Sequence, residues 1–283
     1  MKFVKILLLF ITLSQSFNSF SQEMSNIIQP IKGNKGKMYI FGGWNRAHFS
    51  NSDIRFRGEN YDFTLKNVVA YDRQTPFALD PYFQITKLSI PQTNLRIGYF
   101  ISEHYNISFG VDHMKYVMEQ NQAVKIKGKI SVAGTKYDGV YNNSDIILTD
   151  DFLTFEHTDG LNYLNLAISH VDNIFDFNKL RIKNFEINFT EGVGIGALMP
   201  RTNTQLLNKK RYDQYHLAGY GLDAKIGLNI LFYKHFFIQS ELKGGYINMP
   251  DIRTTESKSD KAAQHFFYVQ NNIVFGTLFR LTK

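Results

Sequence analysis

Apolar and polar residues alternate along residues 218–232, AGYGLDAKIGLNILF. Every second residue from Tyr220 to Phe232 is apolar, and the odd-numbered positions 219–229 carry Gly219, Gly221, Asp223, Lys225, Gly227 and Asn229. A period of two predicts a β-strand, because successive side chains leave a pleated chain on opposite sides. The apolar face is long enough for a strand that crosses a bilayer, which needs roughly 9–11 residues.

Seven other segments show the same alternation, namely residues 38–49, 94–102, 106–118, 161–171, 185–198, 236–248 and 267–281. In the first segment, one face carries Tyr39 and Phe41 and the other carries Gly42, Trp44, Arg46 and His48. Glu191 falls on the apolar side of residues 185–198, which predicts a bulge there or a shifted register.

The connections between these segments alternate in length. Residues 102–105 and 232–235 are tight turns, and residues 172–184 are intermediate. The longer connections are residues 50–93, 119–160, 199–215 and 249–264. This asymmetry is typical of bacterial outer-membrane barrels, in which the turns are periplasmic and the loops extracellular. The prediction is an all-β, antiparallel up-and-down transmembrane barrel of eight strands.

The two longest loops contain alternating pieces of their own, at residues 54–56 and 124–132. We expect these pieces to extend the strands above the membrane as hairpins. Because they could also be further barrel strands, a count of ten or twelve strands is an alternative. A soluble barrel with its polar face outside is the alternative fold. Glycine at positions 192, 194, 196, 219, 221 and 227 favours the membrane barrel, because a crowded interior has no room for large side chains everywhere.

The N-terminus, MKFVKILLLFITLSQSFNSFSQ, has a basic start, an apolar core and a small polar approach to a cleavage site. This pattern predicts a signal peptide at residues 1–21, a flexible segment at residues 22–36 and a barrel domain at residues 37–283. The chain has no cysteine, which excludes disulfides, thiol nucleophiles and a lipoprotein anchor. The expected location is the outer membrane of a Gram-negative cell.

The net charge of +7 favours contact with outer-membrane lipid and anionic lipopolysaccharide. Lysine and arginine are scattered along the chain, so no nucleic-acid partner is expected. We expect a monomer without cofactor or bound metal.

With these features, residues 37–283 resemble the small outer-membrane barrel superfamily, the OmpA- and OmpX-like group in particular. The resemblance includes the last strand, FFYVQNNIVFGTLFRLTK, which looks like the signal that the barrel-assembly machinery reads. The chain departs from that pattern by ending in Leu281-Thr282-Lys283 instead of an aromatic residue. The stretches GWNRAHFSNSDIRF, DHMKYVM and EHTDGLNY also resemble an uncharacterised outer-membrane barrel group of the Bacteroidetes.

The charged residues on the polar faces predict an ion-pair network that fills the lumen, because buried charges must pair. They are Arg46, Arg96, Asp112, Glu186, Asp223, Lys225, Glu241, Lys243 and Arg280. The alternative is a narrow channel for small solutes.

A second candidate site lies at the extracellular rim, where histidines and carboxylates end the outward strands. If the site belongs to a hydrolase, its predicted catalytic residues are His48, Ser50, Asp112, His157 and Asp159. Histidine beside a carboxylate can act as a general base, and outer-membrane lipid A deacylases are the enzymes that use such rim sites. The same groups can hold a divalent ion. We expect instead a structural or surface-interaction role, carried by the loops at residues 50–93 and 119–160. The lipid A hydrolase and the channel remain alternatives.

Overall fold

The computed structural model describes residues 33–87, 90–176 and 184–281. The predicted signal peptide and most of the segment 22–36 therefore lie outside the described residues. The last part of that segment is held in place, because Glu103 Oε2 accepts hydrogen bonds from the backbone N–H groups of Gly33 and Asn34 at 2.6 and 2.7 Å. Within the described ranges, no helix has the length and apolar character needed to cross a membrane.

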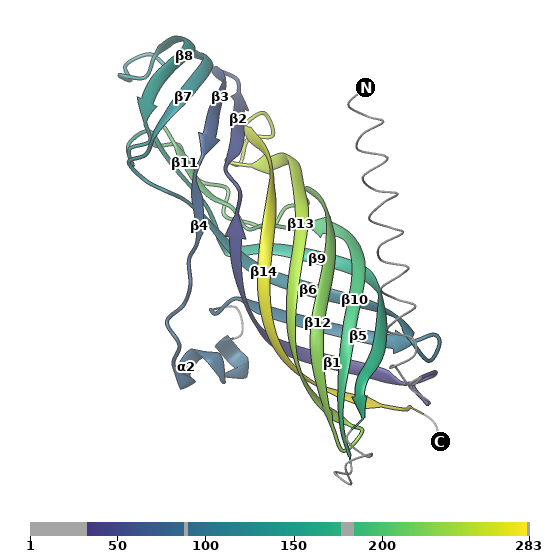
Figure 1. The fold of residues 1–283 in the computed structure, drawn as a ribbon. Helices are drawn as coiled ribbons and strands as arrows, with labels where there is room; N and C mark the ends of the chain where they lie inside the picture. The colour runs from purple at the N-terminus through teal and green to yellow at the C-terminus, as the bar shows by residue number, and fades with distance from the viewer. Residues whose placement is uncertain (1–32, 88–89, 177–183, 282–283) are drawn as a thin grey trace, which may run out of the picture.

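Eight antiparallel strands close into a ring (Figure 1). In ring order they are β1 (Met38–Phe49), β5 (Thr93–Phe100), β6 (Tyr105–Met118), β9 (Leu153–Asp176), β10 (Phe185–Leu198), β12 (Gly219–Phe232), β13 (Phe236–Arg253) and β14 (Lys261–Phe279). β1 pairs with β14 along its whole length, from Met38 opposite Phe279 to Phe49 opposite Tyr268. The predicted count of eight strands in the barrel is confirmed.

The outer face of the ring is apolar and its inner face is mostly polar. On every strand, exposed apolar side chains point outward, for example Ile40, Ile97, Phe109, Leu166, Ile195, Leu228, Ile238 and Ile273. Buried polar side chains point inward between them, as the alternation predicts. A closed ring with such an outer belt suits lipid, because no strand edge is left without hydrogen-bond partners.

The faces of β1 are opposite to those expected. Tyr39 and Phe41 point into the barrel, at 8% and 6% exposure, and so Trp44, Arg46 and His48 point outward. Gly98 lies opposite Tyr39 on β5, and the Tyr39 ring occupies the space that a Cβ at position 98 would need. The neighbouring glycine thus lets the aromatic ring point inward. The inward apolar cluster at this end is Tyr39, Phe41, Phe100, Leu231, Phe237, Val274 and Leu278.

The register of β10 also differs from the expectation at Glu191. Pairing is continuous there, with Glu191 opposite His170 on β9 and Ile226 on β12. The irregularity lies nearer the strand start, between Ile187 and Asn188. Glu191 is therefore a regular outward-facing residue and does not mark a bulge.

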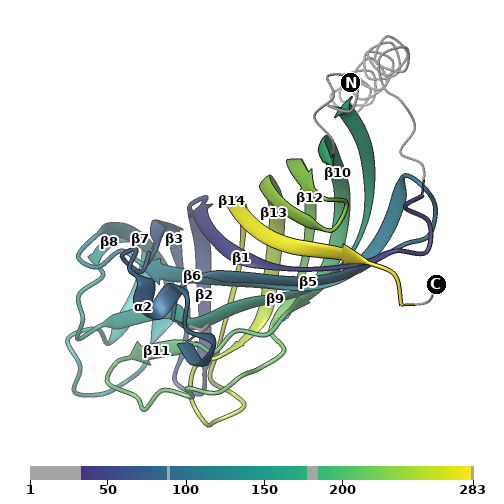
Figure 2. The same ribbon diagram turned by 90° about the horizontal axis from the view of Figure 1, so that it is seen from below.

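We call the end with the short connections the turn end and the other the loop end; in barrels of this type they face the periplasm and the exterior. At the loop end, residues 261–264 of β14 pair with β2 (Ser52–Gly58), and the sheet continues through β3 (Tyr61–Val68), β7 (Ala123–Ile130) and β8 (Gly139–Ile147). We call these four strands the extension (Figures 1 and 2). The predicted hairpins in the two longest loops are confirmed, since they supply all four strands.

The inner face of the extension packs against the loop end of the barrel in one apolar core. Its buried members include Ile54, Phe56, Phe63, Leu65, Val124 and Ile126 from the extension and Tyr116, Phe155 and Phe266 from the barrel. Each of these side chains is at most 6% exposed. This core therefore caps the lumen at the loop end.

Two short strands complete the loop end: β4 (Ala70–Asp72), which pairs with β6, and β11 (Asn203–Leu206), which pairs with β9. A single 3₁₀ turn, η1 (Ile85–Lys87), lies between β4 and β5 in the chain. A further short helix, α2 (Leu79–Tyr82), lies outside the barrel wall (Figure 1). The outward Trp44 ring contacts Tyr82 and Phe83 beside it, with ring centroids 5.5 and 5.2 Å apart.

Candidate functional site in the barrel lumen

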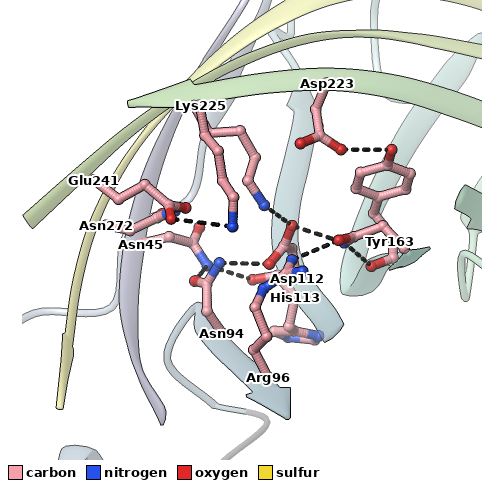
Figure 3. A network of polar contacts seen from close by, with 12 residues as sticks. Asn45, Asn94, Arg96, Asp112, His113, Tyr163, Asp223, Lys225, Glu241 and Asn272 are labelled. Atoms are coloured by element: carbon pink, nitrogen blue, oxygen red, sulfur yellow. Dashed lines mark hydrogen bonds and ion pairs between the residues drawn. The ribbon is translucent and has the colours of Figure 1, made fainter. Parts of the chain in front are cut away.

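The centre of the lumen holds an ion pair that solvent barely reaches. Lys243 on β13 donates to Asp112 Oδ2 on β6 at 2.6 Å, and the two side chains are 1% and 2% exposed. Asn94 donates to Asp112 Oδ1 at 2.6 Å, and Asn165 donates to Oδ2 at 3.1 Å. Figure 3 shows the Asp112 carboxylate between Asn94 and Tyr163. Three donors thus stabilise a carboxylate that would be costly to bury alone.

A second pair lies on the neighbouring strands, where Lys225 Nζ is 3.5 Å from Glu241 Oε2. Asn272 and Gln239 donate to the two oxygens of Glu241 at 2.9 and 3.1 Å. From there a chain of side-chain amides runs toward the turn end, through Gln239, Asn229, Asn188 and Asn173. The interior of the barrel is therefore crossed by connected hydrogen bonds.

Two further charges complete the network. Arg96 donates to Ser108 Oγ at 3.0 Å, and Gly110 lies opposite it on β6. A Cβ at position 110 would collide with the guanidinium, so glycine provides the room for arginine to lie flat across the lumen. On the other wall, Tyr163 donates to Asp223 Oδ2 at 2.8 Å.

Between this network and the turn end lies a cavity of about 60 Å³. Amide side chains of the network line one part of it, and the apolar cluster around Tyr39 and Phe41 lines the other. A drug-sized ligand needs about 300–1,000 Å³. The cavity therefore has room for a few water molecules only.

Five of the eight other charges predicted for the lumen lie buried there with Asp112: Arg96, Asp223, Lys225, Glu241 and Lys243. Glu186 is half-buried and lines the cavity at the turn end. Two were misplaced. Arg46 lies on the outer face of β1, where it donates to Tyr82 Oη at 3.3 Å. Arg280 is exposed beyond the end of β14 and donates to the Gly33 carbonyl at 2.9 Å.

The five predicted hydrolase residues have five separate surroundings. Asp112 belongs to the lumen network and His48 is exposed on the outer face of β1. His157 is buried in the apolar core, with Nδ1 3.0 Å from Thr202 Oγ1. Ser50 Oγ accepts from the Phe267 backbone N–H at 3.0 Å, and the exposed Asp159 accepts from Asn203 at 3.3 Å. Because the faces of β1 are reversed, His48 points away from the lumen in which Asp112 lies.

No protein-family model and no curated protein sequence matches this chain. Among solved structures, the outer membrane protein OprG from Pseudomonas aeruginosa is 11% identical; the alignment covers 89% of this chain and 100% of OprG, with a TM-score of 0.37. The attachment invasion locus protein Ail of Yersinia pestis is 11% identical over 85% of this chain and 99% of Ail, with a TM-score of 0.29. The outer membrane protease OmpT from Escherichia coli is 10% identical over 85% of this chain and 96% of OmpT, with a TM-score of 0.30.

The likeness to these structures concerns the fold alone. The deciding feature is in the chain itself: eight strands close into a ring whose outer face is apolar and exposed. This chain is an eight-stranded β-barrel of the membrane-spanning type.

The prediction of the lumen network from charged residues did not include the side-chain amides that complete it. Asn45, Asn94, Asn165, Gln239 and Asn272 all point inward and are nearly inaccessible. For Asn94, Asn165, Gln239 and Asn272 the signal was present in the sequence, because each stands at a polar-face position of an alternating segment. Asn45 stands on the face of residues 38–49 that also carries Tyr39 and Phe41, which the alternation assigned to the outside. A rule that counts only ionisable residues overlooks all these amides, although amides satisfy the hydrogen-bonding groups of a buried charge.

His157 lies above the apolar belt of the barrel, in the core beneath the extension, and burial lowers its pKa to about 3. Its Nε2 has no hydrogen-bond partner among the described residues, so a proton there would be buried without an acceptor. The unfolded chain takes up this proton below its usual pKa of about 6.5, whereas the folded chain does not. The free energy of unfolding is therefore unaffected by His157 above about pH 6.5, and it falls as the pH is lowered from there toward the pKa of His157 in the folded chain.

We expect His157→Asn to reduce this loss on acidification, because asparagine can still hydrogen-bond Thr202 but does not titrate. In the unchanged protein, the titration of His157 lowers the free energy of unfolding by up to about 1.4 kcal/mol for each pH unit below about 6.5. Urea unfolding of the unchanged protein and of His157→Asn at about pH 7 and about pH 5 measures the loss of stability in each. An equal loss of stability in both proteins would contradict the assignment.

Proposed function

We propose that this outer-membrane barrel is a surface-binding protein, and that the extension holds a basic sheet face toward anionic saccharide chains above the outer leaflet. The observation that carries the proposal is the division of the extension into two faces. One face is the apolar core described above, and the other consists of exposed and half-exposed charged side chains. An amphipathic sheet of this kind is rigid and presents its charges in fixed positions.

The charged face is strongly basic. Seven basic and three acidic side chains give it a net charge of +4, and they are Arg55, Arg57, Lys66, Lys125, Lys127, Lys129, Lys261, Asp53, Asp62 and Asp145. The acidic residues are paired within the sheet, with Arg55–Asp62 at 2.7 Å, Lys66–Asp53 at 2.6 Å and Lys125–Asp145 at 2.7 Å.

Three of the basic residues have no carboxylate within ion-pair distance among the residues that the structure describes: Arg57, Lys127 and Lys129. Lys129 lies beside Arg57 across β3, through Asp62. Lys127 and Lys129 are two residues apart on one strand, so their Cα atoms are about 6.6 Å apart. A repeating anion such as a phosphorylated or acidic saccharide suits such a row.

The interior of the barrel supports a role at the surface over conduction. The lumen is filled by paired side chains and capped by the apolar core of the extension. The five residues of the hydrolase hypothesis have separate partners, so no nucleophile, base and orienting group meet among them. The proposed partners remain lipopolysaccharide and outer-membrane lipid, and the proposed state is a monomer.

The test measures binding of dextran sulfate and of neutral dextran to the full chain in detergent. We expect the folded protein to bind dextran sulfate and not neutral dextran. In the variant Arg57→Gln/Lys127→Gln/Lys129→Gln we expect roughly 100-fold weaker binding, since each basic side chain near an anionic surface contributes about 1 kcal/mol.

The matched control removes three exposed basic side chains from the turn end, at the opposite end of the barrel, as Lys35→Gln/Lys234→Gln/Arg280→Gln. Its affinity should change less than about threefold at an ionic strength of about 0.1 M, where distant charges are screened. Equal losses in both variants would mean attraction by net charge alone and would overturn the proposed site. Absence of binding to dextran sulfate would overturn the proposal as a whole.

A further inference from the structure

Four side chains with metal-binding chemistry meet on the outer face of the barrel at its turn end. His104 lies in the turn between β5 and β6, His170 and Asp172 point outward from β9, and Glu191 points outward from β10, opposite His170. They belong neither to the lumen network nor to the extension. Sequence reasoning overlooked this cluster, because its members are up to 87 positions apart (Glu191 and His104).

The imidazole nitrogens and carboxylate oxygens are close together. His104 Nδ1 lies 2.9 Å from Asp172 Oδ1, and His170 Nδ1 lies 3.6 Å from Asp172 Oδ2. Glu191 Oε1 is 3.6 Å from the same nitrogen of His170. The ligand atoms offered by the two histidines and Asp172 all lie within 4.8 Å of one another.

These distances fit three positions of a tetrahedral site, and the exposed Glu191 side chain needs to turn toward His104 and Asp172 to supply the fourth. With metal–ligand bonds of about 2.0–2.2 Å, neighbouring ligand atoms are separated by about 3.3–3.6 Å. The two 3.6 Å contacts have this separation, and the His104–Asp172 contact needs to lengthen by only a few tenths of an ångström. The backbone supports this arrangement, because the pairing of β9 with β10 is regular at His170 and Glu191.

The site is accessible and its charges call for a cation. The side chains of His104, His170 and Asp172 are 24–32% exposed, and that of Glu191 is 52% exposed. Tyr105 packs on His170 with ring centroids 4.7 Å apart, at the level of the exposed Tyr99, Tyr105 and Phe175 near the periplasmic interface. No lysine or arginine of the described ranges forms an ion pair with Asp172 or Glu191.

We propose that His104, His170, Asp172 and Glu191 bind one Zn²⁺ at the periplasmic rim of the barrel. Two imidazoles and two carboxylates are a ligand set that Zn²⁺ prefers, whereas Ca²⁺ and Mg²⁺ prefer oxygen ligands alone. The ion ties the β5–β6 turn to β9 and β10, close to the irregular pairing at Ile187 and Asn188. Its role is to fasten the rim beside this irregularity in the strand pairing.

The test is calorimetric titration of Zn²⁺ into the tag-free, chelator-treated full chain in detergent. We expect one ion per chain, and binding at least tenfold weaker in His104→Ala and in His170→Ala. The control is His235→Ala, since His235 is an exposed histidine of another periplasmic turn. It should bind as the unchanged protein does, and Ca²⁺ should not compete.

Thermal unfolding gives a second measurement that does not depend on heats of binding. Zn²⁺ should raise the unfolding temperature of the unchanged chain and of His235→Ala, because a ligand that binds only the folded state stabilises it by mass action. The two site variants should gain nothing, while their heat-modifiable migration shows that they fold. Unchanged Zn²⁺ affinity in His104→Ala/His170→Ala, or no saturable binding by the unchanged folded chain, would overturn the proposal.

Discussion

Asp112→Asn is expected to destabilise the barrel by about 3–5 kcal/mol, because it leaves the ammonium of Lys243 buried without a counter-charge. The side chains of this pair are 2% and 1% exposed, so water cannot replace the lost carboxylate. The NH2 group of the new amide also faces a donor in either orientation, because Asn94 donates to one oxygen of Asp112 and Asn165 to the other. Equilibrium urea unfolding in lipid or detergent measures the change as a lowered midpoint.

Two companion variants separate the charge effect from a general one. Asp145→Asn breaks the exposed pair with Lys125, whose side chains are 76% and 53% exposed, and should cost less than about 1 kcal/mol. The double variant Asp112→Asn/Lys243→Met removes both charges and should recover part of the stability. A single variant as stable as the unchanged protein would show that the pair contributes little.

Phe56→Ala is expected to unfold the extension while the barrel stays intact. Phe56 is fully buried on β2, with its ring 5.4 Å from Phe63 and 5.7 Å from Phe155. Removing a buried phenylalanine side chain costs about 3–5 kcal/mol, which is a large share of the free energy of unfolding of a small folded unit. The eight-strand ring has its own pairing and should keep its heat-modifiable migration on a gel.

Limited proteolysis measures the unfolding of the extension in Phe56→Ala, which should appear as faster cleavage within residues 50–68 and 119–152. The control is Phe77→Ala, the same substitution at a side chain that is 69% exposed. It should leave the cleavage rate unchanged. If both units of the Phe56→Ala protein unfold together, the extension and the barrel form one cooperative unit, contrary to the expectation.

The strands of the barrel were predictable because period-two alternation is a local property. The expected bounds at residues 38–49 and 185–198 coincide with β1 and β10, and the lumen positions of Arg96, Asp223 and Lys225 follow from the same alternation. The extension was predictable only in outline. Its strands were visible as short alternating pieces, but their order beside β14 depends on pairings between distant segments.

The sequence by itself determined that alternating strands form a closed barrel with short turns at one end and long loops at the other, and it predicted eight strands with ten or twelve left open. The tertiary structure decided which face of β1 points inward, since Tyr39 fills the space above Gly98 on the next strand. It also decided that His48, Asp112 and His157 lie apart, and that His104, His170 and Glu191 lie together. The physical reason is that alternation assigns side chains to two faces within one strand, whereas proximity depends on the register between strands that are far apart in the chain.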